Sequence, residues 1–440
     1  LEFRRVLFRS NFVNQLQTKF PETDESRKTC AISALSNLIS GIGYFYGNVQ
    51  IKNKPNNQPN LPLFTGTPSK TIFPRGFLWD EGFHGLVYCK WDPDLCLEVL
   101  KSWLNTELPN GWIPREQLRG EEAISYGHPD YIKQIENEAN PPTLLFNILF
   151  LINSYQEGQL SEEAKSVLTG LYPKLEKWFE WFYGTQINPD APTRFVWKNI
   201  DQHKGLCLGS GLDDYPRDVY YGVQPSGSLD LQVWMIFFSE NMIKIAEFQE
   251  KSERVEYYTK LRDQFLGALK DYLDPNDNLY KDLNKQNQKY IFSDHLGYIN
   301  LFPLFFGYIP QDSPQLDAIL DAIYDKSKLW SNYGLLSLSR SDRAYMGNDR
   351  YWTGPIWIQM NYLTLRALKV HYSGNEKAQR IYKELRENLI NNICKVKEKR
   401  DFFFEQYDQN NGDGLRGHPF TGWTSTVFLI IHEKYQGYSL

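Results

Sequence analysis

The sequence predicts an all-α protein in which helical hairpins are wound into a closed toroid. Segments with apolar residues at helical spacing run through the whole chain, and strand signals are scarce. Helices that are apolar nearly all round alternate with amphipathic helices rich in Lys and Glu, as an inner ring inside an outer ring would require. An open helical solenoid is the alternative, and the lack of a fixed sequence period argues against it.

The individual helices are predicted from spacing and from signals at their ends. The segment 29–43 carries apolar residues every three or four positions, and 92–106 opens with Asp92 and Pro93, a favourable pair for a helix start. The same criteria predict helices at 143–155, 161–183, 229–248, 252–273, 313–324, 355–372, 375–396 and 421–433. By contrast, 48–70 is rich in Asn, Pro, Lys and Thr and is predicted to be a loop or linker. No second domain boundary follows it, so 11–440 is treated as one domain.

The first ten residues, LEFRRVLFRS, are interpreted separately. They lack an initiator Met, and Arg4, Arg5 and Arg9 interrupt their apolar residues, unlike the core of a signal peptide. One permitted codon choice for them resembles a common short-read sequencing adapter. We therefore interpret residues 1–10 as translated adapter and leave them out of the fold prediction. On this interpretation the natural protein continues upstream.

Composition and spacing argue against several classes of function. The net charge of -5 and the pI of about 5.9 disfavour a nucleic-acid partner that binds by counterion release. Aromatic residues make up 15% of the chain, which suits a cleft where sugar rings stack, although most will be core. The most apolar stretch, 144–152, is too short to cross a bilayer. The five cysteines lack metal-ligand spacing, and at least one is free or paired outside the chain. We predict no metal and no cofactor.

Four segments mix carboxylates, aromatic residues and Gly or Pro, as site loops on a rigid scaffold do. They are FPRGFLWDEGFH (73–84), NGWIPREQLRGEE (110–122), SGLDDYPR (210–217) and FFFEQYD (402–408), the last followed by GHPFTGWTS (417–425). Glycoside hydrolysis needs a protonated carboxyl and an ionised carboxylate, from separate segments that face each other across the sugar. Burial among aromatic side chains raises a carboxyl pKa toward the value that a general acid needs. Asp213 and Glu405 fit this requirement, with capping or ion pairing as the structural alternative for each.

Six motifs in order carry a resemblance to a known family. FPRGFLWDEGFH, GWIPREQLRGEEA, NPPTLL, SGLDDYPR, FEQYD and FTGWTS closely resemble those of the processing α-glucosidases of glycoside hydrolase family sixty-three, from about Thr71 to Glu433. The resemblance implies an (α/α)6 barrel that carries the active site, preceded in the family by a β-rich domain that this sequence lacks. It implies an inverting exo-α-glucosidase that removes the terminal α-1,2-linked glucose from the N-glycan precursor. It places the enzyme in the endoplasmic reticulum lumen, tethered to the membrane through its N-terminal part.

The resemblance also implies a set of site residues. Asp213 is implied as the general acid and Glu405 as the general base, with an exchange of roles between Asp213 and Asp214 left open. Asp80 is implied to accept hydrogen bonds from sugar hydroxyls. The residues implied to contact the substrate are Phe77, Trp79, Asp80, Arg115, Glu116, Asn140, Asp214, Trp357, Tyr407 and Trp423. For Arg217 the favoured interpretation is an ion pair that braces Asp214 or Glu405.

One departure from the family pattern keeps the substrate open. Ser226, Gly227 and Ser228 precede Leu229, where the animal and fungal members carry Glu-Arg-His. A trehalase-like or glucoamylase-like hydrolase is an alternative because such enzymes share the toroid and a similar placement of acid and base, and it would be recognised by preference for trehalose over α-1,2-glucosyl oligosaccharides. A sugar-binding toroid without catalysis is the other alternative, and the presence of both Asp213 and Glu405 argues against it.

Overall fold

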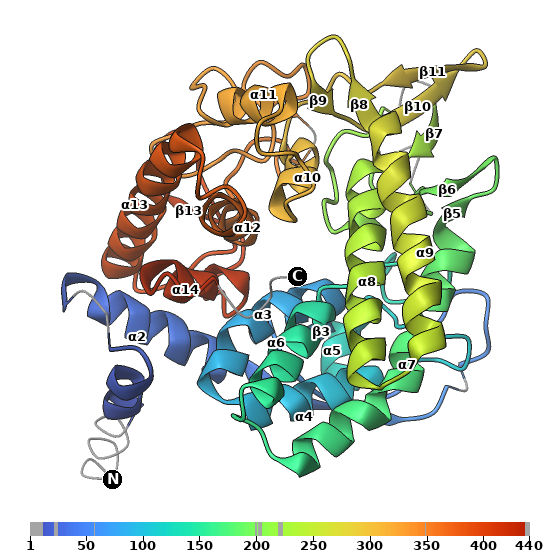
Figure 1. Ribbon diagram of the computed structural model, residues 1–440. Coiled ribbons are helices and arrows are strands. Elements are labelled where there is room, and N and C mark those ends of the chain that lie inside the picture. Colours follow the sequence, from blue (N-terminus) through green and yellow to red (C-terminus); the bar gives the residue numbers. More distant parts are fainter. Residues whose placement is uncertain are drawn as a thin grey trace.

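The computed structural model describes residues 12–21, 25–56, 58–198, 200, 205–218, 223–347 and 349–435, so the ten residues interpreted as adapter lie outside it. Outer and inner helices alternate along the described chain (Figure 1). The outer helices are α2 (Glu25–Ser40), α4 (Pro93–Leu104), α7 (Glu162–Gln186), α9 (Ser252–Ala268), α11 (Pro314–Ile323) and α13 (Glu376–Arg400). The inner helices are α3 (Leu78–Trp91), α6 (Leu144–Gln156), α8 (Leu229–Phe248), α10 (Phe302–Phe305), α12 (Ile358–Val370) and α14 (Val427–Ile431).

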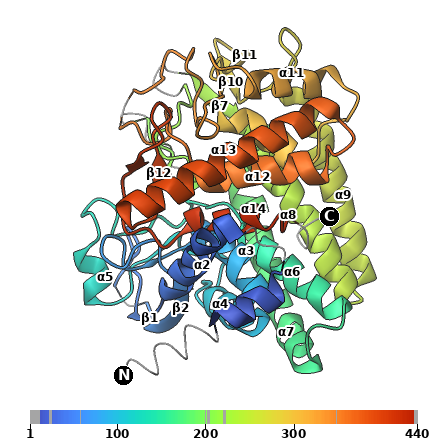
Figure 2. The ribbon, with the colours of Figure 1, turned by 90° about the vertical axis from the view of Figure 1, so that its left-hand side faces the viewer.

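The inner helices close into a ring. Each packs against the next, from α3 through α6, α8, α10 and α12 to α14, and the 3-10 turn η5 (Trp423–Thr426) that leads into α14 packs back against α3. Inner helices such as α8 are buried on nearly all sides, whereas α13 exposes a charged face outside α12 (Figure 2). The predicted closed toroid of helical hairpins is therefore confirmed. None of the described helices is long and apolar enough to cross a membrane.

Two inner helices were not predicted, the four-residue α10 and the longer α3. The segment 73–84 was expected to be a loop, but α3 begins at Leu78 and continues to Trp91. The expectation was wrong because α3 contains Gly82 and Gly85, which lower helix propensity. A Cβ atom at Gly82 would lie 2.3 Å from Thr143, and one at Gly85 would lie 2.0 Å from Asn147. The two glycines therefore let α3 approach α6 closely.

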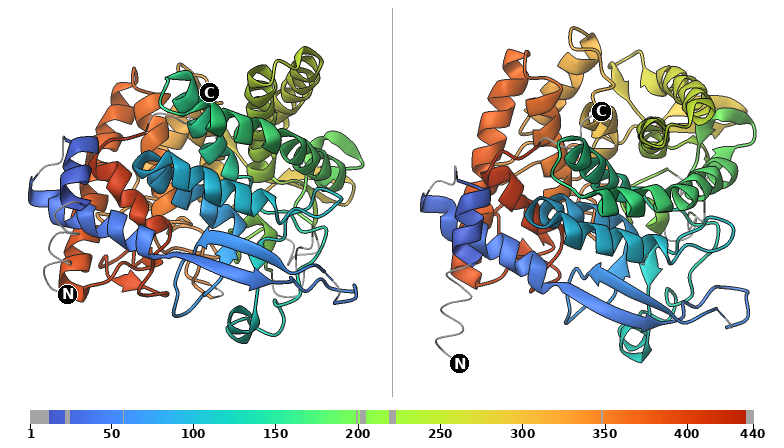
Figure 3. Two further views of the ribbon diagram at one scale, coloured as in Figure 1. Left: turned by 90° about the horizontal axis from the view of Figure 1, so that it is seen from below. Right: turned by 60° about the horizontal axis from the view of Figure 1, so that its bottom comes forward.

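The predicted loop 48–70 is wrong in its second half. Strand β2 (Leu61–Gly66) pairs antiparallel with β1 (Ile42–Gly47), and this hairpin runs along the outside of the helices (Figure 3). Leu63 and Thr65 alternate inward, as in a strand buried on one face. The remaining strands are short: β3 (Gly76–Phe77) with β4 (Glu116–Gln117), β5 (Ile187–Asn188) with β6 (Ala191–Phe195), β7 (Gln224–Gly227) with β10 (Leu283–Gln286) and β11 (Lys289–Phe292), β8 (Leu273–Asp274) with β9 (Leu279–Tyr280), and β12 (Gln406–Tyr407) with β13 (Gly414–Leu415).

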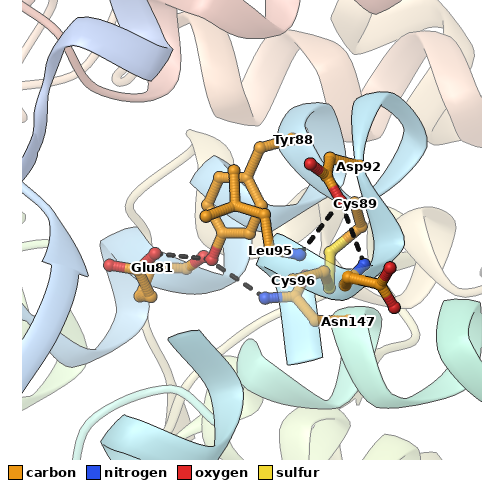
Figure 4. The surroundings of a disulfide bond; sticks show 8 residues. Glu81, Tyr88, Cys89, Asp92, Leu95, Cys96 and Asn147 are labelled. Atoms are coloured by element: carbon orange, nitrogen blue, oxygen red, sulfur yellow. Dashed lines mark hydrogen bonds between the residues drawn. A yellow bond between two sulfur atoms is a disulfide. The ribbon is translucent and has the colours of Figure 1, made fainter. Parts of the chain in front are cut away.

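Short helical elements complete the chain, and two disulfides tie helices together. The short elements are α5 (Glu121–Ser125), η1 (Leu208–Ser210), η3 (Leu269–Tyr272) and η4 (Tyr298–Leu301). One disulfide joins Cys30 of α2 to Cys394 of α13. The other joins Cys89 to Cys96 around the start of α4, where Asp92 accepts two backbone N–H groups (Figure 4). Cys207 is buried and unpaired, which confirms that one cysteine lacks a partner within the chain.

Candidate active site

Loops that precede and follow the inner helices form a pocket lined by both predicted catalytic carboxyls. Of the residues singled out in the sequence, those in the lining are Phe77, Trp79, Asp80, Arg115, Glu116, Asn140, Asp213, Glu405 and Trp423. The lining also includes residues that were not singled out: Pro68, Phe73, Arg75, Tyr131, Leu208, Gly211, Tyr351, Trp352 and Phe420. Asp214, Trp357 and Tyr407 lie outside this lining. Two adjoining depressions share Tyr131 and Leu208 with the pocket, and one of them is also lined by Asp213 and Glu405.

A tight turn presents Asp213. The turn follows η1, and its closing residue Gly211 has φ of 76°, a left-handed conformation that favours glycine. A Cβ atom there would lie 2.6 Å from the Trp79 indole, so the turn lies directly against that ring. The Asp213 carbonyl accepts the Cys207 N–H at 2.8 Å, which closes the loop behind the side chain. Burial raises the pKa of Asp213 to about 8, against the lowering influence of Arg115.

Glu405 is held by donors on both carboxylate oxygens. It is 4% exposed and lies directly before β12. The Tyr351 hydroxyl donates to Oε1, and the Gly417 N–H donates to Oε2 at 3.0 Å. Burial raises the Glu405 pKa, while Tyr351, the Gly417 N–H and Arg416 oppose the increase. The side chain is therefore fixed in orientation, with its charged form supported by hydrogen bonds.

The first turn of α3 supplies aromatic and acidic groups to the pocket. The Trp79 ring lies 5.8 Å from Trp423 and 6.0 Å from Trp352, measured between ring centroids. Burial, and then the charge of Glu405, raise the pKa of Asp80 well above its ordinary value. Asn140 accepts the Trp79 N–H at 2.9 Å and donates to the Gly209 carbonyl at 3.1 Å. It therefore ties this helical turn to the loop that carries Asp213.

Asp213 lies beside a cluster of arginine and glutamate side chains that pair with one another. Glu116 pairs with Arg115 at 2.8 Å and with Arg75 at 2.8 Å, and Glu138 lies 3.7 Å from Arg115. The Arg75 guanidinium also lies over the Phe77 ring, 4.8 Å from its centroid. Arg115 is thus shared between carboxylates and faces Asp213 with only part of its charge uncompensated.

Three predicted contact residues lie outside the pocket lining, although Asp214 lines an adjoining depression. Asp214 is 1% exposed and accepts backbone N–H groups from the segment 351–352. Trp357 stacks on the far side of Trp352, with ring centroids 3.7 Å apart and planes 2° from parallel. Tyr407 is fully buried, and its backbone pairs with Ile356. In these positions the three side chains support the pocket wall.

The position of Arg217 differs from its expected one. It forms no ion pair with Asp214 or Glu405 and instead contacts Asp230 at 2.5 Å and Asp282 at 3.1 Å. The expectation of an ion pair was right, but its partners were wrong, because they lie on α8 and beside β10, outside the site loops. Burial lowers the Arg217 pKa, but the two aspartates raise it well above the ordinary value.

Residues that the sequence prediction missed share a recognisable signal. Tyr351 and Trp352 lie in YWTGP between two helices, which has the aromatic residues, Gly and Pro of the other site loops but no carboxylate. Ser226, Gly227 and Ser228, which depart from the family pattern, lie in β7 and directly after it. They are not part of the pocket lining. The segment 410–414 forms the turn that connects β12 to β13, with Asp408 accepting the Asn410 and Asn411 N–H groups.

A model of the C-terminal domain of glycosyl hydrolase family 63 matches residues 1–433. The chain belongs to this family. It is 34% identical to Alpha-glucosidase 2 of Arabidopsis thaliana over 99% of this chain and 62% of that protein. It is 33% identical to the mannosyl-oligosaccharide glucosidase of Saccharomyces cerevisiae over 93% of this chain and 58% of that protein. The chain thus spans about three-fifths of the length of these relatives.

Solved structures of the family agree with the fold. The GH63 mannosylglycerate hydrolase from Thermus thermophilus, in complex with glucose, superposes with a TM-score of 0.66 and 15% identity. The match covers 91% of this chain and 99% of that one. At this identity the likeness establishes the fold alone. This chain is an all-α (α/α)6 toroid, as its sequence predicted.

Proposed function

We propose that this chain is the catalytic part of an inverting exo-α-glucosidase of family 63, and that it removes terminal α-1,2-linked glucose from the N-glycan precursor. The observation that carries the proposal is the pairing of Asp213 and Glu405 in one aromatic pocket, contributed by segments almost two hundred residues apart. The relatives that are named mannosyl-oligosaccharide glucosidases support the substrate.

In this mechanism Asp213 is the general acid. With a pKa of about 8 it is protonated at neutral pH and donates its proton to the glycosidic oxygen as the bond to the anomeric carbon breaks. Glu405 is the general base. It removes a proton from a water molecule that attacks the anomeric carbon from the opposite face, so β-glucose is released.

The other lining residues hold the glucose unit. Trp79, Trp352 and Trp423 offer aromatic faces and edges to the sugar ring, while Asp80 accepts hydrogen bonds from its hydroxyls. Such hydrogen bonds replace the water that a buried carboxylate lacks and stabilise its ionised form. Arg115 lies beside Asp213 and contributes positive charge next to the departing oxygen.

The test is proton NMR of the glucose first released from an α-1,2-linked glucosyl oligosaccharide, with wild type and Glu405→Gln compared. Initial β-glucose from the wild type and none from the variant supports both inversion and the role of Glu405. Initial α-glucose would contradict the mechanism. A separation between the Asp213 and Glu405 carboxyls of roughly 6.5–9.5 Å in a ligand complex is expected, because the attacking water must fit between them.

The substrate panel for the same assay separates the alternatives. Faster hydrolysis of trehalose or of α-1,4-linked glucosides would indicate a trehalase-like or glucoamylase-like enzyme. Sugar binding without any turnover would indicate a lectin-like toroid. The 34% identity to named glucosidases, against 20% to a mannosylglycerate hydrolase of Selaginella moellendorffii, favours the oligosaccharide.

The proposal includes the cellular setting. N-glycan processing places the protein in the endoplasmic reticulum lumen, with an upstream β-rich domain and a membrane anchor in the same protein, and residues 1–10 as translated adapter. Protease protection of the native protein in sealed microsomes, and sequencing of its transcript upstream of codon 11, test these parts. An accessible protein, or a genomic sequence that encodes LEFRRVLFRS in frame, would contradict them.

A further inference from the structure

The aspartate that follows the proposed acid contacts a distant loop. Both carboxylate oxygens of Asp214 accept backbone N–H groups: Oδ2 from Tyr351 at 3.1 Å and Oδ1 from Trp352 at 2.5 Å. The donors lie 137 and 138 residues further along the chain. Asp214 lines a depression beside the pocket, but the side chain is only 1% exposed and backbone donors occupy both of its oxygens. These contacts place Asp214 to hold the loop rather than to give a proton to a substrate.

The segment held by Asp214 reaches the proposed base. The Tyr351 hydroxyl donates to Oε1 of Glu405. The Tyr351 carbonyl accepts the Trp357 Nε1–H at 2.9 Å, and the two rings meet edge to face with centroids 4.7 Å apart. The backbone of Tyr351 is therefore fixed on both sides, by Asp214 at its N–H and by Trp357 at its carbonyl. The position of its hydroxyl follows from these two contacts.

We propose that Asp214 is a positioning residue for the base, acting through Tyr351. Its carboxylate holds the N–H groups of residues 351 and 352, which places the Tyr351 hydroxyl on Glu405 and the Trp352 indole in the pocket wall. The loop that carries the acid thus also holds the hydrogen-bond donor of the base. The inference rests on the proposed function, in which Glu405 activates water.

The charges around the two groups set the expected pH behaviour. Asp214 is faced by Asp213, Asp349 and the two N–H donors, and Glu405 is faced by Tyr351, the Gly417 N–H, Arg416 and Asp80. The Tyr351 hydrogen bond lowers the Glu405 pKa, and the charge of Asp214 raises the pKa of Asp213. In a bell-shaped profile of kcat/KM, the acidic limb reports the base and the basic limb reports the acid.

The experiment measures kcat and KM across this profile for wild type, Asp214→Asn, Tyr351→Phe and the double variant. Both single variants are expected to move the acidic limb to higher pH and to lower kcat roughly tenfold with a smaller change in KM, as expected for a hydrogen bond to a charged group. Asp214→Asn should also move the basic limb to lower pH. The double variant should be no worse than the more impaired single variant, since both changes remove one pathway.

Two further variants keep the test decisive. Asp214→Glu retains the charge but displaces the carboxylate, so it should move the acidic limb alone, and it replaces Asp214→Asn if that variant does not fold. Asp274→Asn is the control away from the pocket lining: Asp274 is also a buried aspartate that accepts a backbone N–H, from Asn276 at 3.0 Å, and it pairs in addition with Lys281 at 2.8 Å. It should lower the unfolding midpoint and leave the pH profile unchanged.

The outcomes separate this inference from the function beneath it. A wild-type protein without α-glucosidase activity would overturn the proposed function. An active wild type whose acidic limb is unchanged in Asp214→Asn or in Tyr351→Phe would overturn the positioning role alone. Strictly additive losses in the double variant would also overturn it, because Asp214 and Tyr351 would then act independently.

Discussion

Two groups of buried charges share the loop 205–218, the first through Asp213 and the second through Arg217 and Asp218. The charges of the two groups are compensated differently. In the pocket, Asp213, Asp80 and Glu405 are three carboxyls whose pKa values are raised by burial, with cations only nearby. A few residues later, Arg217 is enclosed by Asp230 and Asp282, and Asp218 contacts His295 at 3.0 Å. We call these residues the paired group. The pocket carboxyls can still accept hydrogen bonds from a ligand, whereas the carboxylates of the paired group are engaged by cationic side chains of the protein.

The paired group shows why a cluster of acidic residues alone does not reveal a functional site. Asp218, Asp294 and His295 lie close enough to hold a cation. However, the Arg343 guanidinium contacts Asp218 at 2.7 Å and Asp294 at 3.1 Å, and His295 also bonds Asp342 at 3.0 Å. These side chains supply the positive charge that a metal ion would bring. The comparison teaches that a functional carboxyl is recognised by the absence of a cationic side chain paired directly with it.

The largest effect is expected from neutralising the pocket carboxyls. Glu405→Gln and Asp213→Asn should each lower kcat by roughly 10³-fold or more, because each removes a proton-transfer group. The free energy of unfolding should change by less than about 1 kcal/mol at neutral pH, because Asp213 is already protonated there, and because the amide of the Glu405→Gln variant can still accept the Gly417 N–H and donate to the Tyr351 hydroxyl oxygen. Steady-state kinetics and urea unfolding measured on the same preparations check both parts. A variant that loses stability together with activity would place its carboxyl with the paired group.

The paired group should respond in the opposite way. Asp230→Asn leaves the Arg217 guanidinium buried with less than its required counter-charge and should lower the free energy of unfolding by about 3–5 kcal/mol. Urea unfolding followed by tryptophan fluorescence measures the loss, and Glu253→Gln on the exposed face of α9 is the surface control. A loss below about 1 kcal/mol would show that the pair adds little to stability.

The histidine in the paired group predicts a pH-dependent contribution to stability. Burial alone would lower the His295 pKa, but hydrogen bonds to Asp218 and Asp342 raise it from 6.5 to about 9. A pKa raised by folding stabilises fully below pH 6.5, and the contribution disappears as the pH rises through about 9. The stability difference between wild type and His295→Gln should therefore be up to about 3 kcal/mol in mild acid and shrink across this window. A difference that is constant with pH would exclude a protonated His295.

The smallest effect is expected at the turn that links the two groups. Gly211→Ala forces a side chain into a left-handed conformation against the Trp79 indole and should cost about 1–2 kcal/mol of stability. Because Trp79 lines the pocket, KM should rise with it. Thermal unfolding and kinetics check the two effects, and Gly267→Ala, which has open space for a Cβ atom, is the matched glycine control. Equal behaviour of the two variants would show that the turn adapts.

The sequence predicted most of the toroid and half of the pocket lining, but the paired group only in part. Helical spacing located the outer helices, and motif order located Trp79, Asp80 and Trp423. Helix α3 was missed because Gly82 and Gly85, which weaken helix propensity, are used for close packing against α6. Such packing is a property of two segments, and no local pattern reports it.

Long-range pairing explains the other differences. The partners of Arg217 were misassigned because Asp282 lies 65 residues away, beyond any motif. Tyr351 and Trp352 were missed because their role depends on Asp214 and Glu405, which the chain brings to them only when the ring closes. Local patterns identified which residue types belong to a site, and the partner of each residue required the fold.

The disulfide between Cys30 and Cys394 gives the toroid a covalent topology as well as a packed one. It joins the first and last outer helices across a sequence separation of 364 residues, so most of the chain becomes a single covalent hoop. One proteolytic cut in any loop between these cysteines would open the hoop without releasing a fragment. Nicked molecules would migrate as one species in a denaturing gel and separate only after reduction. A cut backbone therefore leaves its two pieces covalently joined for as long as this disulfide stays oxidised.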